Sequence, residues 1–284
     1  MQSFLASEIE NANENEAKFH VIPVPYEASV SYGGGTVNGP KAILKASDQL
    51  EIYDEWLNNN PHELGIHTQN EVDCSGKPEE VIENIYHATK KAIDNNAIPV
   101  VLGGEHTVTY GAIKALYEKN KDFGIVQFDA HADLRDSYEG SIYSHASVMK
   151  RCLDLGVPVF GIGIRAFSKE EADLRVEKGL KSLDVLKIAE EGIDFNKDIL
   201  PENFPKKIYI TFDVDGLDPS VIRATGTPVP NGLTWREAMA ILKNIKKGRE
   251  IIGLDVNELA PDENDNASTF AAALLTYRLM SLAV

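Results

Sequence analysis

Three side chains that commonly bind metal ions alternate in the segment DAHAD: Asp129, His131 and Asp133. The segment follows the apolar run FGIVQF, which is typical of a buried strand. In an extended chain, residues two apart point to the same side. These three side chains would then share one face at the end of that strand. A metal site explains the pattern, and helix caps or turns beside a structural histidine are the alternative.

Polar residues follow three other apolar runs in the same way. GGEH follows IPVVL, DVDGLDP follows KIYITF, and DVNE follows EIIGL. Ligand sites in α/β sheets form at the carboxyl ends of the strands. Because four strand ends would meet there, the sequence predicts one cleft. Its candidate metal ligands are His106, Asp129, His131, Asp133, Asp213 and Asp215.

The chemical types of these six side chains favour hard or borderline divalent ions. Four carboxylates and two imidazoles, without a thiolate, suit Mn²⁺ above all. A catalytic zinc ion usually takes three protein ligands, so six side chains favour two ions with shared carboxylates. The four negative charges would balance two divalent ions. Such a pair can generate a hydroxide nucleophile from water at neutral pH.

The elements that must position these residues alternate along the chain. Candidate strands lie at 19–24, 98–104, 123–129, 157–164, 207–215 and 250–256, and candidate helices at 77–96, 107–120 and 234–247. Continuous apolar strands separated by helices indicate a mostly parallel sheet covered on both faces. We therefore expect a single α/β domain over residues 1–284. The acidic segment 1–18 fits either a loosely attached tail or an interface element.

The composition argues against several classes of partner. The 284 residues include 28 Lys and Arg against 44 Asp and Glu, a formal net charge of −16. Nucleic acids and anionic membranes both require a basic patch, which this balance does not favour. No apolar run approaches the roughly 20 residues needed to span a bilayer, and no secretory signal pattern opens the chain. We expect a cytoplasmic protein, and the charge is compatible with a small cationic substrate.

Several motifs, taken together and in their order along the chain, resemble those of the ureohydrolase (arginase/agmatinase) family. Within that family, the resemblance is strongest to agmatinase. The motifs are GGEHTVTYG, DAHADLRD, SHAS, FDVDGLDP, ATGTPVP and DVNELAP, with SYGGGTVNGPKAIL resembling the substrate loop of agmatinase-like members. The resemblance runs from around His20 to the C-terminus. It implies a three-layer α/β/α sandwich, two Mn²⁺ ions per chain, and assembly as a homotrimer or hexamer. It also implies hydrolysis of a guanidino group to urea and an amine.

The resemblance further implies roles for individual residues. One ion would be held by His106, Asp129, Asp133 and Asp213, and the other by Asp129, His131, Asp213 and Asp215, with Asp129 and Asp213 bridging. Asp133 would also accept a hydrogen bond from the bridging hydroxide. Glu258 would bind the guanidinium bidentately beside Thr227, and His145 would pass a proton to the leaving amine. Without the resemblance, Glu258 fits a surface loop acid and His145 a solvated or capping histidine.

Three positions depart from the family pattern. Ala146 replaces the usual glycine after the histidine of SHAS, and Asn231 replaces the first of two glycines, which asparagine tolerates because it adopts left-handed backbone readily. Arg135 stands where arginases carry an asparagine that helps bind the substrate carboxylate. Arg135 fits either a carboxylate contact or an ion pair with Asp136 or Glu139.

Agmatine is a dication without a carboxylate and suits an acidic cleft, so we predict its hydrolysis to putrescine and urea. The alternative is arginase or another guanidino-acid hydrolase, such as guanidinobutyrase or formiminoglutamase, which would use Arg135. A single-zinc deacetylase of related fold is disfavoured by the paired acids. A non-catalytic metal-binding relative is disfavoured because all six expected ligands are present.

Overall fold

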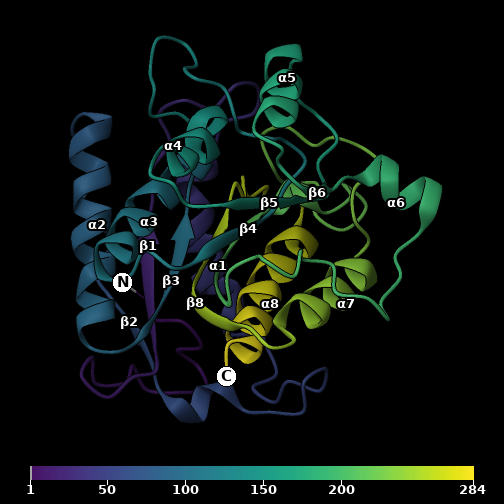
Figure 1. Ribbon diagram of the computed structural model, residues 1–284. Coiled ribbons are helices and arrows are strands. Elements are labelled where there is room, and N and C mark those ends of the chain that lie inside the picture. The colour runs from purple at the N-terminus through teal and green to yellow at the C-terminus, as the bar shows by residue number, and fades with distance from the viewer. Residues whose placement is uncertain (1) are drawn as a thin grey trace.

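Eight strands form one sheet in the computed structural model, which describes residues 2–284 (Figure 1). Their order is β2–β1–β3–β8–β7–β4–β5–β6, and every neighbouring pair is parallel. The parallel α/β prediction is therefore confirmed. The strands are β1 (Phe19–Val24), β2 (Ile66–Thr68), β3 (Ile98–Gly103), β4 (Gly124–Phe128), β5 (Val159–Ile162), β6 (Ser182–Leu183), β7 (Lys207–Asp213) and β8 (Glu250–Asn257).

Two short strands at the sheet edges were not predicted from the sequence. β2 has three residues and β6 has two, and both lie outermost. Segments this short carry no usable periodicity, since strands usually have about five residues or more. The inner strands are longer and nearly all buried, and these are the ones that the apolar runs predict.

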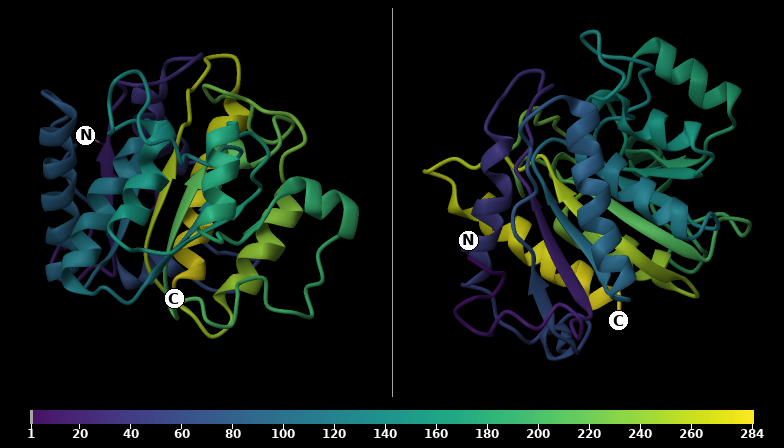
Figure 2. Two further views of the ribbon diagram at one scale, coloured as in Figure 1. Left: turned by 45° about the horizontal axis from the view of Figure 1, so that its top comes forward. Right: turned by 90° about the vertical axis from the view of Figure 1, so that its left-hand side faces the viewer.

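Helices cover both faces of the sheet, as expected for three layers (right-hand view of Figure 2). One apolar cluster joins the sheet to α1, α7 and α8, and another joins it to α2, α3 and α4. No helix in residues 2–284 combines the length and apolar character needed to cross a membrane. The α-helices are α1 (Gly39–Ser47), α2 (Pro78–Asp94), α3 (Thr109–Lys119), α4 (Val148–Asp154), α5 (Lys169–Glu177), α6 (Val185–Glu191), α7 (Trp235–Lys246) and α8 (Asn266–Leu282).

The N-terminal segment packs against the sheet edge and α1. The Phe4 and Leu5 side chains are buried in the cluster with α1, α7 and α8. The Leu5 backbone N–H donates to Ser47 Oγ at 2.8 Å, and the Phe4 N–H donates to Thr68 Oγ1 at 2.9 Å. Loose attachment therefore does not describe this part of the segment.

Candidate metal centre

The carboxyl ends of four neighbouring strands carry the predicted ligands. β3, β8, β7 and β4 are consecutive in the sheet, and because they are parallel their carboxyl ends lie at one edge. Asp129 directly follows β4, Asp213 is the last residue of β7, and Glu258 directly follows β8. His106 lies three residues beyond β3 and opens a 3-10 turn. The predicted convergence of strand ends is what the fold produces.

One group of ligand atoms surrounds the His106 ring. His106, Asp129 and Asp213 each place a ligand atom within 4.8 Å of the others, and all three are buried. His106 Nδ1 lies 3.1 Å from Asp129 Oδ2 and 3.5 Å from Asp213 Oδ2. Asp133 Oδ2 lies 3.0 Å from the same nitrogen. All four side chains therefore face one small volume.

A second group adjoins the first and shares Asp129 with it. Asp129, His131 and Asp215 also place ligand atoms within 4.8 Å of one another. His131 Nδ1 lies 3.0 Å from Asp215 Oδ2 and 3.7 Å from Asp129 Oδ1. One carboxylate thus belongs to both groups, which is the arrangement that a bridging ligand requires. Asp213 lies only in the first group, so its predicted bridging role stays a prediction.

The backbone of 129–133 differs from the extended strand that the alternating pattern predicts. β4 ends before Asp129, and Asp133 adopts a left-handed backbone with φ of 54°. The three side chains reach one site through this turn, so the predicted extended geometry is wrong, and their role as metal ligands stays a prediction. Glu258 also has a positive φ, of 66°, as does Asn231. Left-handed non-glycine residues cluster at functional sites because the surrounding fold must hold them there.

A hydroxyl and a carboxylate lie behind His106. Thr211 Oγ1 donates to Asp255 Oδ1 at 2.6 Å and lies 2.7 Å from His106 Nε2. Because the hydroxyl proton is engaged by Asp255, the oxygen accepts from Nε2–H, which leaves the lone pair on Nδ1. Sequence reasoning missed this pair, although Thr211 alternates with Asp213 on β7. Asp255 is also held by Tyr209, Thr109 and Asn257.

The carboxylates repel one another in the protein alone. Burial raises the pKa of Asp213 well above its usual value, and Asp215 and Asp129 add to the effect. Burial and the neighbouring Asp129 carboxylate raise the pKa of Asp133 to about 7. Buried like charges at this density are costly unless a cation lies between them.

The donor set fits a pair of divalent cations. Within residues 2–284, no hydrogen bond satisfies the buried His106 Nδ1, which faces carboxylate oxygens. With Nε2 protonated toward Thr211, acceptor atoms would face acceptor atoms across the gap. A cation resolves this conflict, and oxygen and imidazole donors suit Mn²⁺ and similar ions. The two ligand groups therefore have the chemistry of a binuclear centre.

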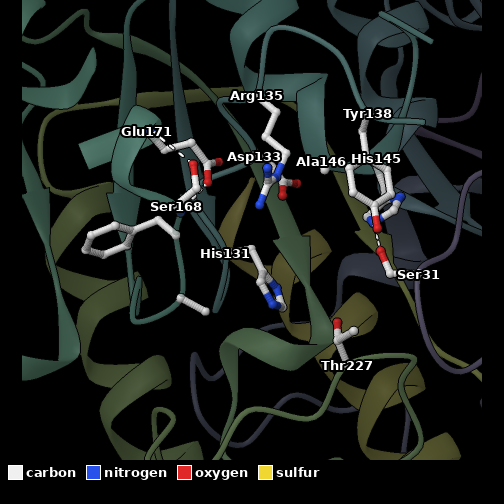
Figure 3. A pocket seen from close by; sticks show the side chains of 12 residues that line it. Ser31, His131, Asp133, Arg135, Tyr138, His145, Ala146, Ser168, Glu171 and Thr227 are labelled. Atoms are coloured by element: carbon white, nitrogen blue, oxygen red, sulfur yellow. Dashed lines mark hydrogen bonds between the residues drawn. The ribbon is translucent and has the colours of Figure 1, made fainter. Parts of the chain in front are cut away.

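A cavity of about 340 Å³ opens over His131 and Asp133 (Figure 3). Thr227 lies at its rim, with Oγ1 3.4 Å from Asp215 Oδ2. His145 also lines the cavity and is half-buried. Burial lowers the pKa of its imidazole. The lining residues are Ser31, His131, Asp133, Arg135, Tyr138, His145, Ala146, Ala166, Phe167, Ser168, Glu171 and Thr227.

Glu258 lines a smaller hollow beside this cavity, together with His131, His145 and Thr227. Its Oε1 accepts a hydrogen bond from the His106 backbone N–H at 2.6 Å. Burial raises the pKa of Glu258 well above its usual value, and nearby Glu105 adds to this. Glu258 is therefore a buried site acid rather than the surface loop acid considered as the alternative.

Arg135 reaches into the cavity from the segment after Asp133 (Figure 3). Its guanidinium lies 5.7 Å from the centre of the Tyr138 ring. Within residues 2–284 it forms no ion pair with Asp136 or Glu139, so that expectation is wrong. Asp136 pairs instead with Arg151, with the nitrogen and oxygen 2.8 Å apart. The Arg135 charge thus remains available to the cavity.

Comparison with known proteins places this geometry in a family. The arginase family model matches residues 17–281. The N(1)-aminopropylagmatine ureohydrolase of Synechocystis is 38% identical, over 93% of this chain and 89% of its own. The agmatinase of Pyrococcus horikoshii is 31% identical, over 97% and 95%. In structure, the agmatine ureohydrolase of Thermoplasma volcanium superposes with a TM-score of 0.87 at 29% identity, covering 100% of this chain and 94% of that one.

The matches agree in both reaction class and fold. The named relatives are ureohydrolases, and an arginase from Medicago truncatula also shares the fold, with a TM-score of 0.83 at 26% identity over 94% of this chain and 88% of that one. The family implies a binuclear metal centre, which the two ligand groups sharing Asp129 suit. The chain is thus a hydrolase of guanidino C–N bonds and belongs to the arginase family.

Proposed function

We propose that this chain hydrolyses agmatine to putrescine and urea with two Mn²⁺ ions. The observation that carries the proposal is the pair of ligand groups that share Asp129 on the floor of a cavity. One ion would be held by His106, Asp129, Asp133 and Asp213, and the other by Asp129, His131, Asp213 and Asp215. When bound, such a pair supplies a nucleophile from water at neutral pH.

Glu258 is the proposed guanidinium contact. A planar guanidinium matches a carboxylate with two parallel hydrogen bonds, which would fix the carbon that is attacked. The buried Glu258 carboxyl has a raised pKa in the protein alone, so an arriving cation would favour its ionised form. Thr227, at the cavity rim, would flank the bound group. Substrate binding would thus replace a buried repulsion with a paired charge.

His145 is the proposed proton carrier. As the oxygen of water adds to the guanidino carbon, the C–N bond to the amine breaks and that nitrogen must gain a proton. Burial lowers the pKa of His145, so a neutral imidazole can accept the water's proton and then pass it to the amine. Overall, counted for the uncharged compounds, the oxygen and one hydrogen of the water enter urea, and the other hydrogen enters the amine.

A longer amine is the second candidate substrate. Three of the relatives, 36–38% identical, are named N(1)-aminopropylagmatine ureohydrolases. Hydrolysis of that compound would release urea and an aminopropyl derivative of putrescine by the same chemistry. Arg135 in the cavity favours a third option, a guanidino acid.

Homo-oligomeric assembly and a cytoplasmic location stay predictions.

Urea release by the Mn²⁺-loaded chain tests the proposal. Agmatine, N(1)-aminopropylagmatine, L-arginine and 4-guanidinobutyrate are compared at equal concentrations. We expect agmatine to exceed both acids in kcat/KM by at least about a hundredfold, because a missing or unpaired charged group is strongly rejected. A higher kcat/KM for N(1)-aminopropylagmatine would transfer the proposal to the longer amine. Preference for either acid would contradict it.

A further inference from the structure

The loop that opens the glycine-rich segment holds His145 through both ring nitrogens. Ser29 Oγ lies 3.0 Å from His145 Nδ1 and also accepts the His145 backbone N–H at 3.1 Å. Ser31 Oγ lies 3.0 Å from His145 Nε2 (Figure 3). Ser31 is exposed and lines the cavity, whereas Ser29 is half-buried behind the ring. The two nitrogens therefore have different surroundings.

A fully buried carboxyl group lies behind Ser29. Glu105 has no exposed surface, and its Oε1 accepts the Ser29 hydroxyl at 2.8 Å. Its Oε2 accepts the backbone N–H groups of Ala28 and Ser29, both at 2.6 Å. Thr107 Oγ1 donates to Oε1 as well, at 2.5 Å. The Glu105 carboxylate thus anchors the backbone of the loop at Ala28 and Ser29, and it also orients the Ser29 hydroxyl.

These contacts determine which nitrogen of neutral His145 carries the proton. The single hydroxyl proton of Ser29 points to Glu105, because a carboxylate oxygen only accepts. The Ser29 oxygen must then accept from Nδ1–H, which leaves the Nε2 lone pair toward the cavity. A proton carrier in the proposed reaction needs that lone pair on the substrate side, where the exposed Ser31 hydroxyl, 3.0 Å away, can donate to it.

We propose that Glu105 and Ser29 are positioning residues that fix the tautomer and ring orientation of His145. This inference rests on the proposed role of His145 in urea release. Among the residues that the structure describes, Glu105 is neither in the cavity lining nor in a candidate ligand group, so it acts through Ser29. The arrangement repeats at a second histidine what Asp255 and Thr211 do behind His106.

A double-mutant cycle on the Mn²⁺-loaded full chain tests the proposal. Ser29→Ala removes the hydroxyl but keeps both backbone anchors to Glu105. We expect kcat to fall about tenfold and KM to stay within about twofold, as for partners that orient a functional histidine. In the His145→Ala background the same change should cost nothing further, since coupled residues are not additive. Ser29→Thr, which retains a hydroxyl, should restore most of kcat.

Ser75→Ala is the matched control, because it also removes a serine hydroxyl that donates to a carboxylate, Asp73 Oδ1 at 2.6 Å, but on an exposed turn. It should leave kcat unchanged. Equal losses from Ser29→Ala in both backgrounds, or no loss at all, would overturn the proposal.

A second measurement does not depend on urea release. Histidine ¹⁵N–¹H correlation spectra of the diamagnetic, Zn²⁺-loaded chain report which ring nitrogen is protonated. The proposal predicts the His145 proton on Nδ1, and a mixture of tautomers in Ser29→Ala. A proton on Nε2 in the unsubstituted chain would overturn it. A wild-type chain that shows the predicted tautomer but releases no urea would refute the proposed function and leave the positioning intact.

Discussion

Two histidines of the site, His106 and His145, are held in different ways. His106 is fully buried, and its Nε2 lies 2.7 Å from Thr211 Oγ1 on β7, which donates to Asp255 on β8. His145 is half-buried, and serine hydroxyls from a loop contact its ring. Segments at the carboxyl ends of strands thus supply the candidate metal ligands, while loop serines hold the group that is proposed to carry protons. Substitutions among the candidate metal ligands should therefore change the metal content, whereas substitutions at His145 and its loop should change turnover alone.

The largest expected effect comes from the residue that both ligand groups share. Asp129→Asn keeps the side-chain size but removes the charge that would bridge two ions. We expect loss of both ions and urea release at background level, measured by metal content per chain and by steady-state assay. Asp173→Asn is the control, because Asp173 is exposed and, in the described part of the chain, its ion-pair partner is Lys169. Full activity in Asp129→Asn would refute the two-ion arrangement.

Substitution of His145 should lower turnover without changing the metal content. His145→Ala removes the proposed proton carrier, so kcat should fall about a hundredfold, a typical contribution of a positioned acid or base. The metal content should stay at the wild-type value, because the imidazole belongs to neither ligand group. Steady-state kinetics and metal analysis on the same preparation check both statements. Loss of metal in this variant would erase the distinction between metal binding and turnover.

A smaller effect on metal affinity should follow from the group behind His106. Thr211→Val is nearly isosteric and removes the hydroxyl between Nε2 and Asp255. We expect metal affinity to fall about tenfold, since such outer partners orient a ligating imidazole. Competition with a chromogenic chelator measures it. Thr276→Val is the buried control, because the Thr276 hydroxyl donates to the Ala272 carbonyl within α8. Unchanged metal affinity in Thr211→Val would contradict the proposed tautomer of His106.

Arg135→Met should have the smallest effect. If agmatine is the substrate, the exposed Arg135 contributes no contact to it, and kcat/KM should change by no more than about threefold, as for a solvated charge. The comparison of agmatine with 4-guanidinobutyrate in wild type and variant measures this. A fall of tenfold or more for the acid alone would identify Arg135 as a carboxylate contact.

Much of the sheet, and the meeting of the candidate metal ligands at the strand ends, could be predicted from the sequence, because both arise from local patterns. Apolar runs mark the inner strands, and acids or histidines directly after them mark the strand ends. The turn at 129–133 could not be predicted, since the left-handed Asp133 depends on its surroundings. The orienting pairs were also out of reach. Thr211 meets His106 across 105 residues of chain, and Ser29 meets His145 across 116.

A metal titration tests directly whether the site binds two ions. Metal-free chain is titrated with Mn²⁺ while bound ion and urea release from agmatine are followed together. We predict that binding and activity both saturate at two ions per chain, with little activity at one. Full activity at one ion per chain, or activity that persists without metal, would contradict it.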